Sequence, residues 1–409
     1  MTRYAVIVDP ISTGEAYPDA FREAGCAPVA VLSAAEPAFA PSTWHPERFE
    51  HVHHFDGDLE RLAASLRAYD PRYLVAGAEC GVELADALVD LVAPGSGNVG
   101  GLAAARRDKW AMAQALQRAG VAHLRQLCTD DPAHVAAWLR ETGLDREPIV
   151  LKPPRSAGAD NVHLVPAGAD WRPAFDEILG ADNMVASVNH AVLVSEYAQG
   201  TELLVDSYSV DGRHGLVDVC RYVKRQFGDR IGIYDCVEFL APDDPDVAAV
   251  WPYTRDVLDA VGVRNGCGHS EVMLTPRGPR LIETGSRPAG GGHQMICELA
   301  TGDNQIARTV AHRERGEFKP GFELVQHLRG VFISAPRAGI WRNAELFDGV
   351  EALRSFHAKH FPFATGDEVP ATRDIASFLA WVILASPDRA AVDDDYREIK
   401  QWEALIRID

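Results

Sequence analysis

Two glutamates, Glu271 and Glu283, lie on either side of a short turn near the end of the second third of the chain. The flanking segments are strand-like and the turn, at residues 275–279, contains proline and glycine, so the sequence predicts a β-hairpin. If the hairpin is symmetric about this turn, Glu271 faces Glu283. The same symmetry places Met273 opposite Leu281. Facing carboxylates repel each other, whereas Mg²⁺ is commonly bound by one or two carboxylates together with substrate phosphates, so the pair is a candidate metal site.

A fixed positive charge and a glycine run follow this hairpin. Arg287 lies four residues after Glu283 and precedes Gly290, Gly291 and Gly292. An arginine can fork onto phosphate oxygens, and exposed glycine N–H groups also bind anions. Beside a metal, this combination indicates a phosphoryl-transfer site. The alternative interpretation is a solvated hairpin followed by an ordinary glycine-rich loop.

Composition restricts the class of protein. The chain has 409 residues, enough for two or three domains, and its 47% hydrophobic and 24% charged content is that of a globular protein. A net charge of −19 without a basic stripe argues against a nucleic-acid partner and against docking on anionic lipid. The N-terminal apolar run is too short for a signal peptide, and residues 376–385 are too few to span a bilayer. We therefore expect a cytoplasmic protein without a membrane partner.

The seven cysteines include no C-x-x-C pair, and their number is odd. This pattern favours reduced thiols in a cytoplasm over a disulfide framework or a zinc site.

The first hundred residues alternate between strand and helix patterns. Strands are predicted at residues 4–8, 28–32 and 73–76, with helices at 17–25 and 81–92. Such alternation indicates a parallel sheet of the Rossmann-like type.

Two short motifs in this region are interpreted as structural. Residues 95–100 spell G-x-G-x-x-G, but they follow a predicted helix, whereas a dinucleotide fingerprint requires a preceding strand. The run His51-Val-His-His54 lacks the spacing and the partner ligands of a structural zinc site, so we expect a surface or linker segment.

The central region could present cations to a nucleotide. A helix predicted over residues 106–120 carries Lys109 near its start, and a strand delivers Lys152 into a loop that contains Ser156 and Gly158. Each lysine alone is more readily explained as a solvated surface residue. Together with the N–H groups of the loop, they fit clamps on the phosphates of a nucleotide.

A strand predicted at residues 191–195 ends at Glu196, Tyr197 and Ala198, where backbone groups could contact the edge of an adenine. Glu202 lies beyond a glycine and could accept hydrogen bonds from ribose hydroxyls. Both glutamates also fit exposed charges at strand ends.

Two further regions, residues 203–222 and those after residue 312, also carry strand and helix patterns. Residues 203–210 and 215–222 predict a hairpin around Asp211-Gly212. After residue 312, a strand is predicted at 329–334 and a helix at 348–357, which we interpret as a C-terminal subdomain.

The order of these parts resembles the ATP-grasp superfamily: a lysine on a helix, a lysine before a small-residue loop, Glu-x-x-x-Gly-x-Glu, two glutamates and an arginine. Four segments are similar, more narrowly, to the L-amino-acid ligases, or dipeptide synthetases. They read Arg-Arg-Asp-Lys-Trp-Ala-Met, Leu-Lys-Pro-Pro-Arg-Ser-Ala-Gly, His-Ser-Glu-Val-Met-Leu and Glu-Thr-Gly-Ser-Arg-Pro-Ala-Gly-Gly-Gly. The resemblance is strongest over residues 105–300 and weakest in the last hundred.

The resemblance implies an α/β architecture, α+β in its central part, with the ATP-grasp fold. A Rossmann-like N-terminal domain would occupy residues 1–104. The nucleotide-binding and catalytic region would occupy residues 105–312, with a lid lobe at about 120–200. A C-terminal subdomain at 313–409 would complete the ligase core.

It also implies a role for each candidate residue. Nucleotide phosphates would be bound by Lys109, Lys152 and the loop of Ser156 and Gly158, adenine by Glu196 and the backbone of Tyr197 and Ala198, and ribose by Glu202. Glu271 and Glu283 would bind the metal, Arg287 would be catalytic, and His269, Ser286, Gly290, Gly291 and Gly292 would contact substrates. One position departs from the family pattern. Gly285 stands where many ATP-grasp enzymes have an asparagine metal ligand, which leaves the number of metal ions open.

The implied reaction is amide formation between two amino acids. ATP would phosphorylate the carboxylate of one, and the amine of the other would attack the acyl phosphate, releasing ADP and phosphate. Mg²⁺ would be the ion, with Mn²⁺ as a second candidate, and the partners would be small-molecule acids and amines; a homodimer is compatible with the sequence. Three bases remain candidates for the amine proton, namely His269, His293 and a phosphate oxygen.

Three other functions compete with this one. A ligase that joins an amino acid to a non-amino-acid acid or amine, in a specialised biosynthetic pathway, would share every residue named. A small-molecule kinase would need no amine pocket. A non-catalytic ATP-binding module would be expected to have lost Glu271, Glu283 or Arg287.

Overall fold

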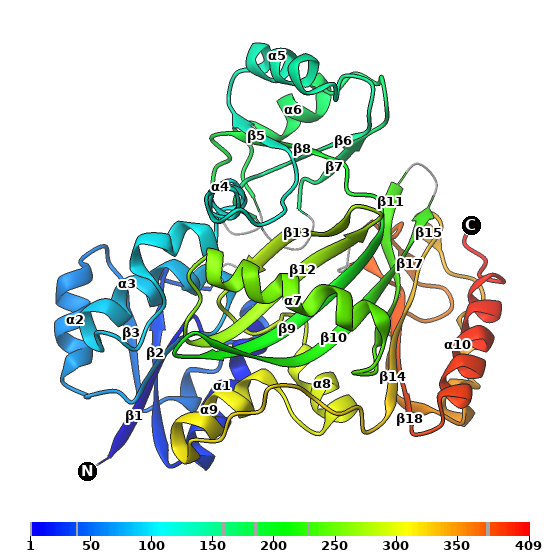
Figure 1. The fold of residues 1–409 in the computed structure, drawn as a ribbon. Helices are drawn as coiled ribbons and strands as arrows, with labels where there is room; N and C mark the ends of the chain where they lie inside the picture. Colours follow the sequence, from blue (N-terminus) through cyan, green and yellow to red (C-terminus); the bar gives the residue numbers. More distant parts are fainter. Residues whose placement is uncertain (1, 38–39, 157–159, 184–186, 228–229, 374–376) are drawn as a thin grey trace.

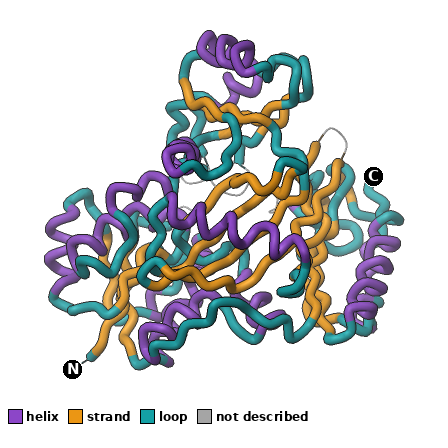
Figure 2. The backbone as a smooth tube through the Cα atoms, viewed as in Figure 1, coloured by secondary structure: helices purple, strands orange, loops and turns teal. Residues whose placement is uncertain are grey.

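The computed structural model describes residues 2–37, 40–156, 160–183, 187–227, 230–373 and 377–409. An N-terminal layer and a large central sheet lie side by side, and a smaller lobe stands above the central sheet (Figure 1). Figure 2 shows the strands gathered in the interior and most helices on the outside.

The N-terminal layer is the predicted parallel sheet. Its strands β1 (Arg3–Val8), β2 (Cys26–Leu32), β3 (His51–His54) and β4 (Tyr73–Ala76) lie in the order β3-β2-β1-β4, all parallel. Helices α1 (Tyr17–Glu23), α2 (Leu59–Arg67) and α3 (Val82–Val92) cover them. Continuous apolar runs such as β1 are buried on both faces, as parallel strands usually are. The histidine run is the edge strand β3, at the surface but not a linker. The G-x-G-x-x-G segment follows α3, as expected.

The smaller lobe, which we name the lid lobe after the role predicted for it, is a four-stranded antiparallel sheet. Its strands β5 (Gln126–Thr129), β6 (Ile149–Lys152), β7 (His163–Val165) and β8 (Val192–Glu196) lie in the order β5-β8-β6-β7, with α5 (Pro132–Thr142) and α6 (Arg172–Ile178) packed on them. Helix α4 (Lys109–Ala119) precedes the lobe. As predicted, Asp108 caps α4, and Gly120 ends it in the left-handed conformation.

The central sheet has eight antiparallel strands in the order β13-β12-β9-β10-β11-β14-β18-β16. Their bounds are β9 Thr201–Val210, β10 Arg213–Phe227, β11 Arg230–Phe239, β12 Gly266–Thr275, β13 Gly278–Gly285, β14 His327–Ile333, β16 Phe356–His360 and β18 Ala380–Ser386. Strands of the last hundred residues thus extend the sheet that carries the glutamates.

Helices cover both faces of this sheet. Helix α7 (Pro245–Ala260) packs on one face, and α8 (His293–Thr301) and α9 (Gln305–Arg315) pack on the other. Because side chains alternate along a strand, Leu203 and Val205 of β9 meet α7, whereas Leu204 faces α8. Helix α10 (Arg389–Glu403) packs on β14 and β18. The short strands β15 (Gly339–Ile340) and β17 (Glu368–Val369) pair separately.

Short 3-10 helices occupy several connections, at Ser12–Ala16, Pro41–Thr43, Pro46–Arg48, Glu79–Gly81, Gly100–Arg106, Ala344–Phe347 and Val350–Ala352. The prediction of a helix at residues 348–357 is wrong. That segment holds only the last of these short helices and the start of β16, which pairs with β18. Pairing with a distant strand overrides the local helical pattern there.

A β-bulge corrects the predicted register of the glutamate hairpin. Thr275 pairs with Gly278 across a two-residue turn, and Met273 therefore pairs with Arg280 instead of Leu281. A register shift between Val272 and Glu271 then inserts one residue into β13. The predicted pairing of Glu271 with Glu283 is confirmed, but it depends on this bulge as well as on the turn.

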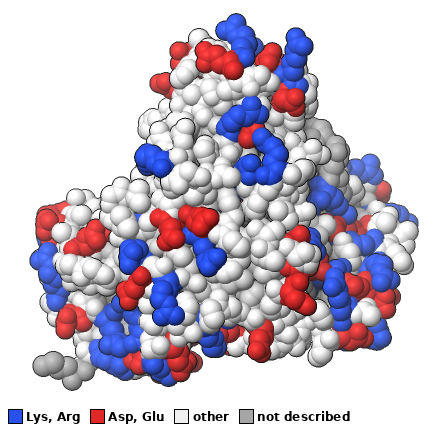
Figure 3. Space-filling view, in the orientation of Figure 1, with Lys and Arg blue, Asp and Glu red and all other residues white. Residues whose placement is uncertain are grey.

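Acidic and basic side chains are intermixed on the face shown in Figure 3. Within the described ranges, no helix combines the length and the apolar character needed to cross a bilayer. All seven cysteines are free thiols.

A buried ion pair joins the N-terminal layer to the central part. Arg106, which is 0% exposed, forms an ion pair with Asp86 of α3 at 2.9 Å. Its guanidinium also donates to the carbonyl oxygens of Val99 and Val261, at 3.1 and 2.9 Å. Loss of one partner would leave the other charge buried without compensation.

We therefore expect Arg106→Met to lower the free energy of unfolding by about 3–5 kcal/mol, the scale of breaking a buried ion pair. Adding Asp86→Asn should recover part of this loss. Arg118→Met is the matched control, because Arg118 is exposed on α4. Denaturant unfolding of the variants measures the effect, and equal stability of Arg106→Met and Arg118→Met would contradict it.

Candidate functional site

A cavity of about 220 Å³ lies between the lid lobe, α4 and strands β9 to β13 of the central sheet. Nine of the residues predicted from the sequence line it: Lys109, Lys152, Ser156, Glu196, Tyr197, Ala198, Glu202, Glu271 and Glu283. Gly158 falls outside the described residues. Elements far apart in the sequence thus bring the predicted phosphate, base, ribose and metal groups to one cavity.

Sequence reasoning missed the other walls of this cavity. Its apolar lining includes Leu124, Val150, Val162, Met273 and Ile282, which suit a flat heteroaromatic base. Two of these had a usable signal: Val150 lies two residues before Lys152 on the same strand, and Ile282 directly precedes Glu283.

Two further polar lining residues, Lys224 and Tyr234, come from β10 and β11. Lys224 Nζ lies 4.6 Å from the centroid of the Tyr234 ring. It also donates to both carboxylate oxygens of Glu202, at 2.7 and 2.6 Å. The predicted ribose carboxylate is thus held by a lysine that no motif indicated.

The facing glutamates differ in their surroundings. Burial, the nearby Glu283 and Glu202 raise the pKa of Glu271. Burial alone would also raise the pKa of Glu283, but Lys109, whose Nζ lies 2.8 Å from Glu283 Oε2, and Lys152 lower it. The charged form is therefore favoured at Glu283 and disfavoured at Glu271. Two hard oxygen donors in this state fit a divalent cation of the Mg²⁺ type.

Lys152 is a buried cation at the end of β6, 7% exposed. Burial, followed by repulsion from Lys109, lowers its pKa to about 8. Among the described residues, none forms an ion pair with it. An anion bound in the cavity would supply the missing negative charge.

Lys109 occupies the first turn of α4 and reaches the lid lobe. Its Nζ donates to the Ser156 carbonyl oxygen at 3.0 Å, and its backbone N–H donates to Pro154 at 2.9 Å. The Ser156 hydroxyl donates to Asp160 Oδ2 at 2.7 Å. The same ammonium therefore contacts both the loop of the lid lobe and the glutamate hairpin.

The carboxylate of Glu196 is already held by two arginines. Arg125 donates to it through Nε at 2.9 Å and Nη2 at 2.8 Å, and Arg277 donates through Nη2 at 3.1 Å. The Tyr197 amide donates to the Pro148 carbonyl at 3.2 Å. Within the described part of the chain, the Ala198 amide has no hydrogen-bond partner. Ala198 N–H is thus the backbone donor left for an adenine edge.

Arg287 does not line this cavity but lies beside a carboxylate of the N-terminal layer. Its Nε forms a short ion pair with Glu79 Oε2, and Arg107 Nη1 lies 3.1 Å from Glu79 Oε1. Burial would lower the pKa of Arg287, but Glu79, Glu283 and Glu271 raise it. The guanidinium is therefore charged and held in place.

Gly285 explains the position of Glu79. A Cβ placed on Gly285 would lie 3.5 Å from Glu79 Oε2 and 3.5 Å from Arg287 Cγ. The space toward which an asparagine side chain would extend is thus filled by the Glu79–Arg287 pair. No sequence motif indicated Glu79 or Arg107, and the departure at Gly285 was the only signal nearby.

The two candidate histidines converge on one buried carboxylate. His269 Nδ1 donates to Asp206 Oδ1 at 2.9 Å, and His293 Nε2 lies 3.4 Å from Asp206 Oδ2. His293 Nε2 also donates to Asp218 Oδ1 at 3.0 Å. Hydrogen bonds to the buried carboxylates of Asp206 and Asp218 therefore orient these histidines.

The remaining predicted substrate residues separate into two places. Ser286 lines a different, smaller cavity of about 50 Å³ between the N-terminal layer and the central sheet. The glycine run lies at the start of α8, where Gly291 and Gly292 have φ of 64° and 74°. A Cβ on Gly290, Gly291 or Gly292 would meet no atom within 4 Å. The run thus borders open space beside Arg287.

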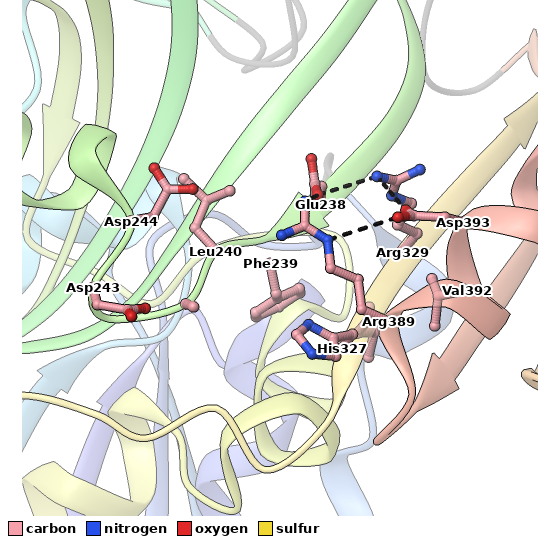
Figure 4. Close-up of a pocket in the computed structure, with 12 residues that line it drawn as sticks. Glu238, Phe239, Leu240, Asp243, Asp244, His327, Arg329, Arg389, Val392 and Asp393 are labelled. Atoms are coloured by element: carbon pink, nitrogen blue, oxygen red, sulfur yellow. Dashed lines mark hydrogen bonds and ion pairs between the residues drawn. The ribbon is translucent and has the colours of Figure 1, made fainter.

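Figure 4 shows another hollow, of about 170 Å³, between the end of β11, β14 and the start of α10. Its central carboxylate, Glu238, accepts hydrogen bonds from Arg221 and Arg329, both at 3.1 Å, and from Arg389 at 3.4 Å. Asp393 contacts Arg329 at 2.9 Å and Arg389 at 3.7 Å. None of the predicted site residues lines this hollow, and its arginines are paired.

Comparisons with known proteins identify the family of this chain. The family model described as the ATP-grasp domain matches residues 145–296. Dapdiamide A synthase of Enterobacter agglomerans is 31% identical over 363 residues, covering 87% of this chain and 84% of that protein. The L-arginine-specific L-amino acid ligase of Bacillus subtilis is 23% identical over 193 residues, covering 47% and 45%.

Solved structures show the same fold over the full length. L-amino acid ligase from Bacillus licheniformis superposes with a TM-score of 0.71 at 14% identity, covering 100% of this chain and 99% of the other. Carboxyaminoimidazole ribonucleotide synthase from Aspergillus clavatus, complexed with ATP, gives a TM-score of 0.69 at 14% identity and covers 99% of each chain. With its relative at 31% identity, the chain belongs to the ATP-grasp superfamily, as a carboxylate–amine ligase.

Proposed function

We propose that this enzyme joins two amino acids by an amide bond, with ATP cleaved to ADP and phosphate. One observation carries the proposal: facing carboxylates and a buried lysine, without an ion-pair partner among the described residues, line one cavity. An arginine and a glycine run follow in the chain. This is the set of groups that phosphoryl transfer to a carboxylate requires. The extensive likeness to dapdiamide A synthase and the L-amino acid ligases supports amino acids as substrates.

Glu271 and Glu283 fit a divalent metal and would hold Mg²⁺, with Mn²⁺ as a substitute ion. When bound there, the ion would neutralise charge on the nucleotide phosphates. Lys109 now compensates the charge of Glu283. With the metal bound, its positive charge would compensate Glu283, and Lys109 would be free to contact the nucleotide phosphates.

The other groups of the cavity would bind ATP. Lys152 gains the anion that its buried ammonium lacks, and the Ala198 N–H faces the adenine edge. Glu202, held by Lys224, accepts hydrogen bonds from ribose hydroxyls. In the first chemical step, an oxygen of the substrate carboxylate bonds to the γ-phosphorus and the bond to the β-phosphate oxygen breaks, so ADP leaves.

In the second step, the amine of the other substrate attacks the acyl carbon, and phosphate leaves with the electrons of the C–O bond. The tetrahedral intermediate carries an oxyanion, which Arg287 and the N–H groups of Gly290–Gly292 would stabilise. His269, His293 and the departing phosphate remain the candidates that receive the proton of the amine.

An acyl phosphate hydrolyses readily, so the site must exclude water during its lifetime. Arg155, on the lid-lobe loop, contacts Asp108 at the start of α4 at 3.0 Å and Glu83 of the N-terminal layer at 3.1 Å. These contacts tie the start of the loop to α4 and to the N-terminal layer. We place the reaction in the cytoplasm, where ATP is available and free thiols stay reduced.

Incubation with ATP, Mg²⁺ and paired pools of acids and amines tests the proposal. Phosphate release should require both an acid and an amine, the nucleotide product should be ADP, and the product mass should equal the two substrates less one water. Omission of the amine is the control. AMP would contradict an acyl-phosphate ligase, and a stable phosphorylated product without amine would indicate a kinase.

The two lysines should respond in opposite ways to removal of their charge. Lys152→Met should raise the melting temperature of the ligand-free protein, because burial disfavours that charge. Lys109→Met should lower it, because Glu283 would be left buried without a partner. Both should weaken ATP binding by about tenfold or more, the scale of a lost charged hydrogen bond. Calorimetry measures both quantities, and a shift of melting temperature in the same direction for both variants would contradict the assignment.

Arg287→Ala should reduce turnover by roughly a hundredfold or more, the scale of losing one preorganised oxyanion donor. Arg287→Lys should rescue it poorly, because an ammonium cannot reproduce the planar fork. The affinity for ATP should change little, because the interaction forms mainly with charge that develops during the reaction. Arg280→Ala, on strand β13 just before Arg287 in the chain, is the control. Loss of ATP binding in proportion to the loss of turnover would instead assign Arg287 to the nucleotide.

A further inference from the structure

A second set of ionisable side chains lies on the same face of the central sheet, next to the metal glutamates. Glu271 pairs with Leu204 of β9, and the following pair on this face joins His269 to Asp206. Asp206 in turn pairs with Asp218 of β10. Helix α8 brings His293 and Cys297, one turn apart, onto these two aspartates. One strand and a helix thus bring three ligand-type side chains together, and Asp206 of the neighbouring strand lies beside them.

These four side chains are close together and buried. His293 Nε2 lies 3.0 Å from Asp218 Oδ1 and 3.4 Å from Asp206 Oδ2. Cys297 Sγ lies 3.1 Å from Asp218 Oδ2. Asp206, Asp218 and Cys297 are 0% exposed and His293 is 6% exposed. Asp218, His293 and Cys297 each place one ligand atom within 4.8 Å of the others.

Hydrogen bonds do not complete this cluster. Asp206 Oδ2 is buried and has no hydrogen-bond donor within the described residues. His293 Nε2 lies 3.4 Å from this oxygen, but it has a single proton at most and already donates it to Asp218. Two facing carboxylates taken out of water are unfavourable unless a cation compensates them. A cation among these atoms would satisfy the oxygen that is left over.

The donor set identifies the kind of ion. One thiolate, one imidazole and two carboxylates suit Zn²⁺ and do not suit Mg²⁺, which prefers oxygen ligands only. Neighbouring ligand atoms in tetrahedral zinc sites lie roughly 3.3–3.7 Å apart. Asp218, His293 and Cys297 are grouped at about this spacing, whereas Asp206 Oδ2 lies 3.4 Å from His293 Nε2 and would turn toward the ion. The remaining oxygen of Asp206 accepts from His269, so this carboxylate has the outer-shell support that metal ligands usually receive.

We propose that Asp206, Asp218, His293 and Cys297 bind one Zn²⁺. The ion takes the place of the thiol proton of Cys297, which is released to solvent. Four protein ligands leave no open position, so the site is structural and takes no part in the ligase reaction. It would fix the start of α8, and with it the Gly290–Gly292 loop, to the sheet. The spacing of the cysteines argued against zinc because the ligands come from three separate elements.

Metal analysis and cobalt spectroscopy of the full chain test the proposal. Protein purified without chelators should contain about one zinc per chain, retained in Glu283→Gln, which disables the proposed Mg²⁺ site. Cobalt exchanged into the protein should give a thiolate charge-transfer band and the strong visible bands of a tetrahedral ion. Cobalt at the glutamate pair would give neither, because oxygen ligands favour octahedral geometry.

Single cysteine variants locate the ligand. Cys297→Ser should lose the zinc, the thiolate band and part of the thermal stability. Cys128→Ser, in the lid lobe, and Cys220→Ser, whose sulfur lies 3.5 Å from Asp218 Oδ1, should keep all three. Loss of the band in Cys220→Ser alone would overturn the ligand assignment. Absence of both zinc and a thiolate–cobalt band in the wild-type protein would overturn the site, even if Cys297→Ser fails to fold.

Discussion

The pairing of Glu271 with Glu283 is the constraint on which the rest of the site depends. The two carboxylates share one face of the sheet only because the β-bulge shifts the register of β13 by one residue. Without that residue, Glu271 would pair with Ile282, and the charge of Glu283 would belong to the opposite face. The facing pair is unfavourable by itself, so every neighbouring cation contributes to its stability.

Internal ion pairs compensate the charges of the candidate site. Lys109 contacts Glu283, Lys224 contacts Glu202, and Arg287 contacts Glu79. In each pair, one or both partners are groups that a nucleotide, a metal or a reacting oxyanion would engage. Binding of a nucleotide and a metal would therefore replace ion pairs within the protein by ion pairs with the ligands. Lys152 is the exception among the described cations of the cavity, since its ammonium forms no ion pair with a described residue, and a bound anion would supply one.

The sequence predicted the features that local chemistry decides. Strand β6 ends at Lys152, Asp108 caps α4, and Gly120 ends it, because each depends on neighbouring residues only. The bulge opposite Val272 was not predictable, since the symmetric turn already accounted for the pairing of the glutamates. The prediction of a helix at residues 348–357 failed for a related reason. Pairing between β16 and β18 decides the structure of this segment, and the two strands are too far apart in the chain for a local pattern to indicate the pairing.

Glu79 shows how a departure from a family pattern can carry structural information. Read alone, Gly285 suggests only that a metal ligand is missing. In the folded chain, the absence of a side chain there leaves room for a carboxylate from the N-terminal layer, which holds Arg287 together with Arg107. A larger residue at position 285 would press on this pair, so Gly285 and Glu79 are coupled by space as well as by charge. Under the role proposed for Arg287, the N-terminal layer would belong to the reacting centre, because its Glu79 sets the position of that arginine.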